Sequence, residues 1–156
     1  MIPGLERAEF LRFGVMHRNT YLHSPGLLAA DYSMLKRPHI FFAGQMTGVE
    51  GYVESTASGF VAGVNAALDA LGKPRKVFPR ETVIGALAHY VKDGGVSKNF
   101  QPMNANFGII APFDKKIKGG KKNRNAAYAE RSLALISSTF CFSEPTDENP
   151  VGCNER

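Results

Sequence analysis

The chain has 156 residues, the size of one ordinary domain, and its 44% hydrophobic and 21% charged residues are typical of a globular protein. The longest apolar stretch, residues 59–71, is interrupted by Gly63, Asn65 and Asp69, which excludes a membrane span there. The amino-terminal residues lack the basic and apolar regions of a secretory signal, so we expect a cytoplasmic location. Cys141 and Cys153 are expected to stay reduced.

The net charge of +5 is concentrated in one segment. Residues 114–131 contain seven basic and two acidic side chains, an excess equal to that of the whole chain. Residues 141–156 contain four acidic side chains and one arginine. A polyanion would therefore be attracted to the first segment and repelled by the second.

The first elements in the chain indicate a strand-rich beginning. Residues 8–22 mix apolar and polar side chains around Gly14 and predict one or two strands with a bend. Residues 23–36 predict a connecting loop with a short apolar turn. The apolar run 39–43, which ends at Gly44, is typical of a strand buried on both faces in a parallel sheet.

A helix is predicted from Tyr52 to Leu71, because Val61, Val64, Leu68 and Leu71 recur at helical spacing and Gly72 and Pro74 follow. Gly59 and Gly63 lie four residues apart within it, at a cost of up to about 1 kcal/mol each relative to alanine. This cost predicts close approach by a neighbouring strand or helix, or by a cofactor across the start of the helix.

Two further helices are expected. The first runs from Pro79 to Lys92 and buries Val83, Ile84, Leu87, Ala88 and Val91. Residues 99–112 predict an extended segment over the body, with no chemistry that the pattern reveals. The second helix covers residues 123–138, with Ala127, Leu133 and Ile136 facing inward, and residues 139–156 predict a disordered acidic tail.

The junction between the strand and the first helix is the best candidate for a ligand site. Gly44, Gly48 and Gly51 let the backbone approach a ring or a phosphate, and the first amides of the helix point beyond the end of the strand. From the pattern alone, a plain turn is an equal alternative. The GxGxxG motif of a primary dinucleotide site is absent.

Four runs carry a more specific resemblance: IPGLERAEFLRFGVMHRNTYLHSP, FFAGQMTGVEGYVESTASGFVAGVNAA, FPRETVIGALAHYV and NFQPMNANFGIIAP. Together, over residues 1–138, they resemble the carboxyl-terminal third of the folate- and FAD-dependent tRNA (uracil-5-)-methyltransferases, the TrmFO family. A related flavoprotein that modifies the wobble uridine of tRNA has a similar AGQ-x-x-G-x-x-GY-x-E turn but no counterpart to GVMHRNTY. It is the alternative family.

The resemblance implies an α/β fold made of the strand-turn-helix half of a Rossmann-like domain that binds FAD or NAD(P), followed by carboxyl-terminal helices. Residues 1–36 would lie near folate and flavin, residues 37–138 would complete the FAD-binding domain with a helical extension, and residues 139–156 would form the tail. The implied reaction forms 5-methyluridine in the tRNA T-loop from methylenetetrahydrofolate, with FAD as cofactor and NAD(P)H as reductant.

The resemblance also assigns site residues. FAD would be lined by Gly44, Gln45, Met46, Gly48, Val49, Glu50, Gly51 and Tyr52. Folate would meet His17, Arg18 and Asn19, although a lone histidine is otherwise more often structural. For a tRNA-modifying enzyme, the RNA phosphates would meet Lys115, Lys116, Lys118, Lys121, Lys122 and Arg124. This run contains no aromatic residue, so base stacking is not expected from it, and a solvated loop is the alternative.

Two parts of the family pattern are missing: the GxGxxG turn and the catalytic cysteines. Cys141 and Cys153 lie outside the resemblance, so no catalytic residue and no metal site are assigned. We expect Met1 to be an internal methionine of a longer enzyme, the isolated chain to be inactive, and the remaining part of that enzyme to be a partner beside tRNA. A non-catalytic RNA-binding or interaction module is the other alternative.

Overall fold

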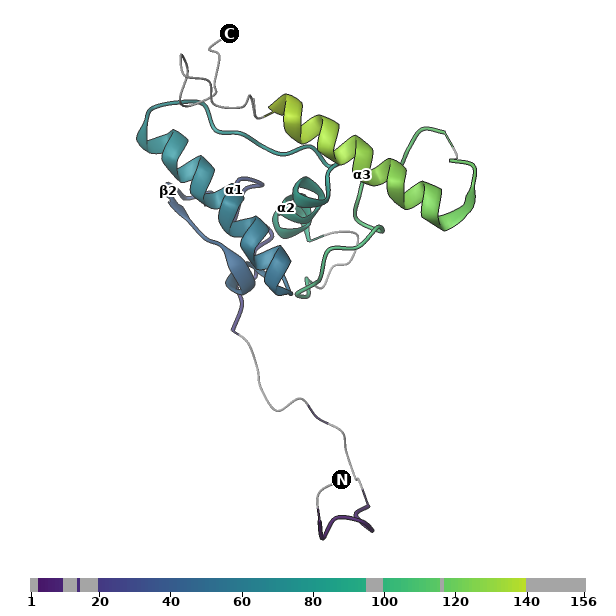
Figure 1. The fold of residues 1–156 in the computed structure, drawn as a ribbon. Coiled ribbons are helices and arrows are strands. Elements are labelled where there is room, and N and C mark those ends of the chain that lie inside the picture. The colour runs from purple at the N-terminus through teal and green to yellow at the C-terminus, as the bar shows by residue number, and fades with distance from the viewer. Residues whose placement is uncertain (1–2, 10–13, 15–19, 95–99, 116, 140–156) are drawn as a thin grey trace, which may run out of the picture.

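The computed structural model describes residues 3–9, 14, 20–94, 100–115 and 117–139 (Figure 1). The elements in chain order are β1 (Ser33–Met34), β2 (Arg37–Phe41), the 3-10 turn η1 (Gly44–Thr47), α1 (Tyr52–Ala70), α2 (Val83–Asp93) and α3 (Gly120–Thr139). The strand-turn-helix β2–η1–α1 and the later helices match the predicted mixed α/β fold. Among the described residues, no helix is long and apolar enough to cross a membrane.

The sheet differs from the prediction. β1 lies inside the segment expected to be a loop, and it pairs antiparallel with β2 through Ser33 opposite Phe41 and Met34 opposite Arg37. β2 is largely exposed, so the prediction of a strand buried in a parallel sheet is wrong for the described residues. The apolar run 39–43 indicates a preference for the strand conformation. It does not indicate how many strands or helices pack against that strand. The described residues of the 8–22 segment contain no strand.

The helix after the turn confirms the predicted element, but its buried face is different. α1 buries Ser58, Val61, Ala62 and Asn65, whereas Leu71 beyond its end is 69% exposed. A Cβ added at position 59 or 63 would meet no atom within 4 Å. The predicted close approach of a neighbouring strand or helix to these two glycines is therefore wrong for the described part of the chain, and close approach of a cofactor stays a prediction.

α2 begins four residues later than predicted because Thr82 caps it. The Thr82 hydroxyl accepts a hydrogen bond from the Gly85 amide at 3.0 Å and donates to Pro79 O at 2.8 Å. Pro79 consequently lies in the turn before the helix. Gly94, with a φ of 72°, ends the helix in the left-handed conformation.

The core lies where α1 and α2 pack on residues 28–32. Its largest buried side chains are those of Leu28, Tyr32, Val49, Val61, Phe78, Leu87 and Val91. α3 is longer than predicted and contributes little: only Ser132 is buried, Ile136 packs on the edge of the core, and Leu133 is 65% exposed instead of inward. Residues 140–156, including both cysteines, lie outside the described residues.

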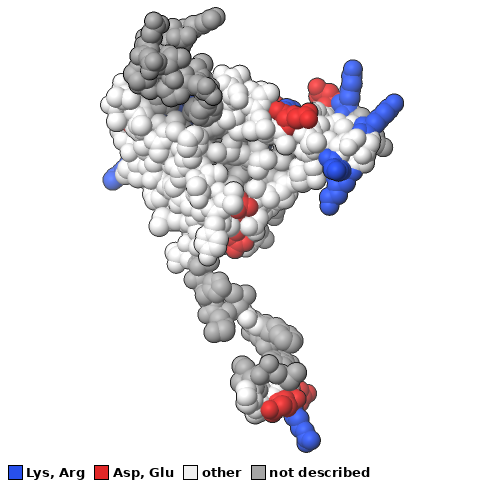
Figure 2. All heavy atoms as spheres, in the orientation of Figure 1, with Lys and Arg blue, Asp and Glu red and all other residues white. Residues whose placement is uncertain are grey.

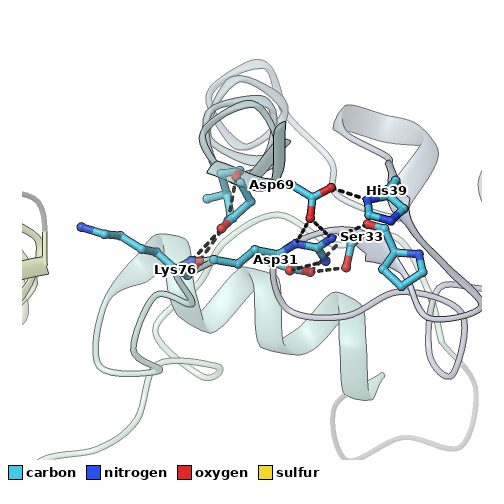
Figure 3. A network of polar contacts seen from close by, with 9 residues as sticks. Asp31, Ser33, His39, Asp69 and Lys76 are labelled. Atoms are coloured by element: carbon cyan, nitrogen blue, oxygen red, sulfur yellow. Dashed lines mark hydrogen bonds and ion pairs between the residues drawn. The ribbon is translucent and has the colours of Figure 1, made fainter. Parts of the chain in front are cut away.

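A polar network fastens the sheet to the far end of α1 (Figure 3). Asp69 on α1 accepts hydrogen bonds from Arg75 at 2.6 Å and contacts His39 Nδ1 at 2.5 Å. Arg75 also lies 3.4 Å from Asp31, which accepts hydrogen bonds from the Ser33 amide and hydroxyl. The bond to His39, with that to Arg75, lowers the pKa of Asp69, and the bond to Asp69 raises the pKa of Arg75.

Candidate functional site

The glycine turn between β2 and α1 is held by its own hydrogen bonds. The Gly44 amide donates to Ser58 Oγ at 2.7 Å, Thr47 Oγ1 donates to Gly44 O at 2.8 Å, and the Gly48 amide donates to Gln45 O at 3.0 Å. Gly48 and Gly51 have φ values of 89° and 98°, which side chains rarely adopt. The turn is thus a fixed structure that depends on glycine at these two positions.

Two other segments hold the turn from either side. On one side, the Leu22 amide donates to Met46 O at 2.8 Å and Ser24 Oγ donates to Thr47 O at 2.8 Å. On the other side, the Glu50 amide donates to Met103 O at 3.0 Å, and the Met103 amide donates to Gly48 O at 3.1 Å. Sequence reasoning missed this second contact, since residues 99–112 have no period that indicates pairing with the turn.

The eight residues expected to line FAD are not equally accessible. Gln45, Met46, Glu50, Gly51 and Tyr52 are exposed, with Tyr52 95% exposed. The Val49 side chain is fully buried in the core, and the Phe100 ring covers Gly48 so closely that an added Cβ would lie 2.6 Å from Phe100 Cε1. Val49 and Gly48 therefore support the turn from beneath.

The start of α1 has the features that a flat, electron-rich ring requires. The amides of Tyr52, Val53 and Glu54 have no acceptor within the helix, and the positive end of the helix dipole lies there. Exposed apolar side chains, those of Met46, Tyr52 and Val53, stand beside these amides. The residues present therefore fit the pyrimidine edge and the apolar face of a flavin.

One carboxylate lies at the same helix start but is already engaged. Glu54 Oε1 accepts a hydrogen bond from the Ala105 amide at 3.1 Å, and Asn104 Nδ2 donates to Glu50 O at 3.0 Å. An added Cβ at Gly51 would lie 2.8 Å from Glu54 Cδ and 2.9 Å from Asn104 Nδ2. The Ala105 amide thus holds the Glu54 carboxylate beside Gly51.

The expected folate residues, His17, Arg18 and Asn19, lie outside the described residues, and so does Lys116 of the basic segment. The other five cations of that segment are exposed. Figure 2 shows a group of Lys and Arg side chains at the beginning of α3, with only isolated ones elsewhere on this face. The structure thus brings the described cations together at one end of the molecule.

A cavity of about 580 Å³ lies among these cations. Phe113 and Tyr128 line it together with Lys115, Lys118, Lys121 and Arg124. The two aromatic rings are in contact, with their centroids 4.9 Å apart. Sequence reasoning missed both rings because they flank the basic run instead of alternating with its lysines.

A larger cavity, of about 890 Å³, lies between α2 and residues 103–112. His89 lines it, and its buried Nδ1 has no hydrogen-bond partner among the described residues. Burial, with the nearby Arg80 charge, lowers the pKa of His89. Arg80 itself forms an ion pair with Asp93 at the wall of the cavity. In the described part of the chain, no three metal-ligating side chains converge.

Comparisons with known proteins place these features in context. The family model described as GIDA, Glucose inhibited division protein A, matches residues 1–74. The methylenetetrahydrofolate–tRNA-(uracil-5-)-methyltransferase TrmFO of Acetivibrio thermocellus is 61% identical over 136 residues, which are 87% of this chain and 31% of that protein. The protein of the same name from Bacillus subtilis is 56% identical over 138 residues, 88% of this chain and 31% of its own length.

A solved structure supports the fold. The structure of Aquifex aeolicus GidA in its form II crystal matches with a TM-score of 0.53 and 26% identity, covering 77% of this chain and 18% of that chain. The predicted fold class is confirmed by this likeness. The chain spans about a third of the length of the curated relatives that it matches.

Proposed function

Because the chain belongs to the family of methylenetetrahydrofolate–tRNA-(uracil-5-)-methyltransferases, we propose that it forms part of an enzyme that makes 5-methyluridine in tRNA. The observation that carries this proposal is the identity of 56–61% to these relatives over nearly nine tenths of the chain. The identity to the GidA structure is 26%, well below the identity to the methyltransferases, which favours the methyltransferase.

The glycine turn is the proposed FAD site. Amides at the start of α1 would donate hydrogen bonds to the pyrimidine edge of the ring, and the side chains of Met46 and Tyr52 would cover its apolar part. Gln45, Glu50, Gly44 and Gly51 would complete this surface, with Gly48 and Val49 as support beneath it. FAD, when bound, would supply the redox chemistry of the one-carbon transfer.

His17, Arg18 and Asn19 are the proposed contacts of methylenetetrahydrofolate. Leu22, which follows His17 by five residues, is hydrogen-bonded to Met46 in the turn, and this connection supports a folate site beside the flavin. The tRNA phosphates would meet the cations at the beginning of α3. NAD(P)H would be the reductant, and the reaction would take place in the cytoplasm.

The rest of the enzyme would have to provide the groups that this chain does not contain. A GxGxxG turn for the FAD pyrophosphate and a cysteine nucleophile for C5 of the uridine are both absent from the sequence in the expected context. We therefore assign to this chain the binding and orientation of the flavin ring, the folate and part of the RNA.

A chimera tests the proposal. Residues 1–138 of this chain replace the matching segment of the Bacillus subtilis relative, and tRNA from cells that lack the native enzyme is analysed for 5-methyluridine. We expect the chimera to restore the nucleoside and to purify with bound flavin. His17→Ala should then weaken the use of folate by the chimera while flavin stays bound. A folded chimera that holds flavin but makes no 5-methyluridine would contradict the proposed reaction.

A further inference from the structure

The basic end of the molecule contains more than charge, because an aromatic cluster forms part of its surface. The Tyr128 ring lies 4.9 Å from the Phe113 ring and 5.5 Å from the Phe107 ring, measured between centroids. Phe107 is 46% exposed, and both Phe113 and Tyr128 line the cavity of about 580 Å³. This volume is within the range of about 300–1,000 Å³ that small-molecule sites occupy.

Arg131 fixes these rings in place. Its guanidinium lies 4.1 Å above the Phe113 centroid and 5.1 Å from that of Tyr128. The same group donates hydrogen bonds to Ala111 O at 2.5 Å, Pro112 O at 3.2 Å and Glu81 O at 3.2 Å. The charge of Arg131 is thus committed to the protein, and the aromatic wall is held between α3 and residues 111–113.

The other cations are free to meet a ligand. Lys115, Lys118, Lys121 and Arg124 line the cavity, and none of them forms an ion pair with a described residue. Asp114 and Glu130 are acidic residues of the same segment, so its net charge remains strongly positive. The site therefore combines unpaired cations with a rigid aromatic wall, as surfaces that bind single-stranded nucleic acid do.

We propose that the cavity at the beginning of α3 binds one unpaired nucleotide of RNA, with the base stacked on the Tyr128 ring beside Phe113, whose plane is inclined to it by 61°, and the adjacent phosphates on Lys118 and Lys121. This inference rests on the proposed function, since it specifies how the basic segment would hold its RNA. It changes the expectation for that segment, because stacking adds a dependence on bases. Every base has an aromatic face, so the site accepts any sequence but requires a base.

The test compares two oligomers with equal phosphate charge: an oligouridylate of eight nucleotides and a ribose-phosphate oligomer of the same length without bases. Fluorescence anisotropy measures the affinity of the whole chain for each at several salt concentrations. We expect the oligouridylate to bind about 5- to 150-fold more tightly, the factor for stacking of a single base. Equal affinities for the two oligomers would overturn the proposal without any variant.

Variants then separate the two parts of the site. Tyr128→Leu should remove the preference for bases and leave the affinity for the base-free oligomer unchanged, whereas Tyr128→Phe should keep the preference. Replacing Lys118 and Lys121 by Gln should weaken the binding of both oligomers equally. It should also reduce the slope of log affinity against log salt concentration by about 0.7 for each lost phosphate contact.

The matched control replaces Lys36 and Lys73, which are exposed on other parts of the surface, and should change neither quantity. A preference for bases that survives in folded Tyr128→Leu would refute stacking at this site. No flavin, folate or methyl transfer enters these measurements, so their outcome is independent of the chimera experiment.

Discussion

Gly85 in α2 and Gly63 in α1 should respond to the same substitution with opposite signs. A Cβ added at Gly85 would lie 2.6 Å from Phe78 O and 2.7 Å from Pro79 C, where ordinary contacts begin near 3.4 Å. Both neighbours are backbone atoms, and Pro79 O accepts hydrogen bonds from Thr82, the residue that caps α2. Gly85→Ala must therefore displace the turn that starts the helix.

The magnitude follows from three contributions. Overpacking costs about 1–3 kcal/mol, and loss of the Thr82 cap costs about 0.5–2 kcal/mol. Alanine in place of glycine within a helix returns about 1 kcal/mol. We expect Gly85→Ala to lower the free energy of unfolding by about 0.5–4 kcal/mol.

Gly63→Ala is the matched control, since an added Cβ at that position meets nothing within 4 Å. It should raise the free energy of unfolding by about 0.4–1 kcal/mol. Urea denaturation followed by circular dichroism measures both variants. A Gly85→Ala variant as stable as Gly63→Ala would show that the backbone carbonyls beside position 85 do not exclude a side chain.

Three further outcomes are expected. Gly48→Ala should lower the free energy of unfolding, measured by urea denaturation, by about 2–4 kcal/mol, because of the positive φ and the contact with Phe100. Phe100→Leu in the same chain should recover part of this loss. The pKa of Asp69 is lowered chiefly by its hydrogen bond to His39. The ionised carboxylate therefore stabilises the folded protein above pH 3.8, and this contribution is lost as the pH falls through the pKa of Asp69 in the folded state. Asp69→Asn should reduce the loss of stability measured below pH 4. Arg131→Met should speed amide hydrogen exchange in α3 but not in α1, because its hydrogen bonds join α3 to the preceding segment.

The extent of α1 was predictable because local signals enclose it: a glycine turn before Tyr52 and Gly72 after its last turn. The surroundings of its glycines were not predictable. Gly63 and Gly85 both interrupt a helical pattern, but one faces open space and the other a backbone carbonyl. That difference depends on which segment packs against each helix, and a residue pattern carries no information about it.

Only part of the candidate site, too, could be predicted from the sequence. The turn around Gly48 and Gly51 was identified from adjacent residues, whereas its support by Met103 joins positions more than 50 apart in the chain. Phe113 and Tyr128 were missed for a related reason. The lysines between them suggested charge alone, and only the return of α3 past residues 111–113 places the two rings together.

The exposed strand β2 has a consequence for how copies of the chain meet one another. An open strand usually invites pairing with a second copy, because its amides and carbonyls are unoccupied. At Pro38 the strand has no amide hydrogen to donate, and Pro38 O already accepts a hydrogen bond from Arg75 Nη2 at 2.8 Å. An approaching strand would find neither partner at this position, with the charge of Arg37 beside it. The polar network that joins the sheet to α1 thus also occupies a carbonyl that a second strand would need for pairing at Pro38.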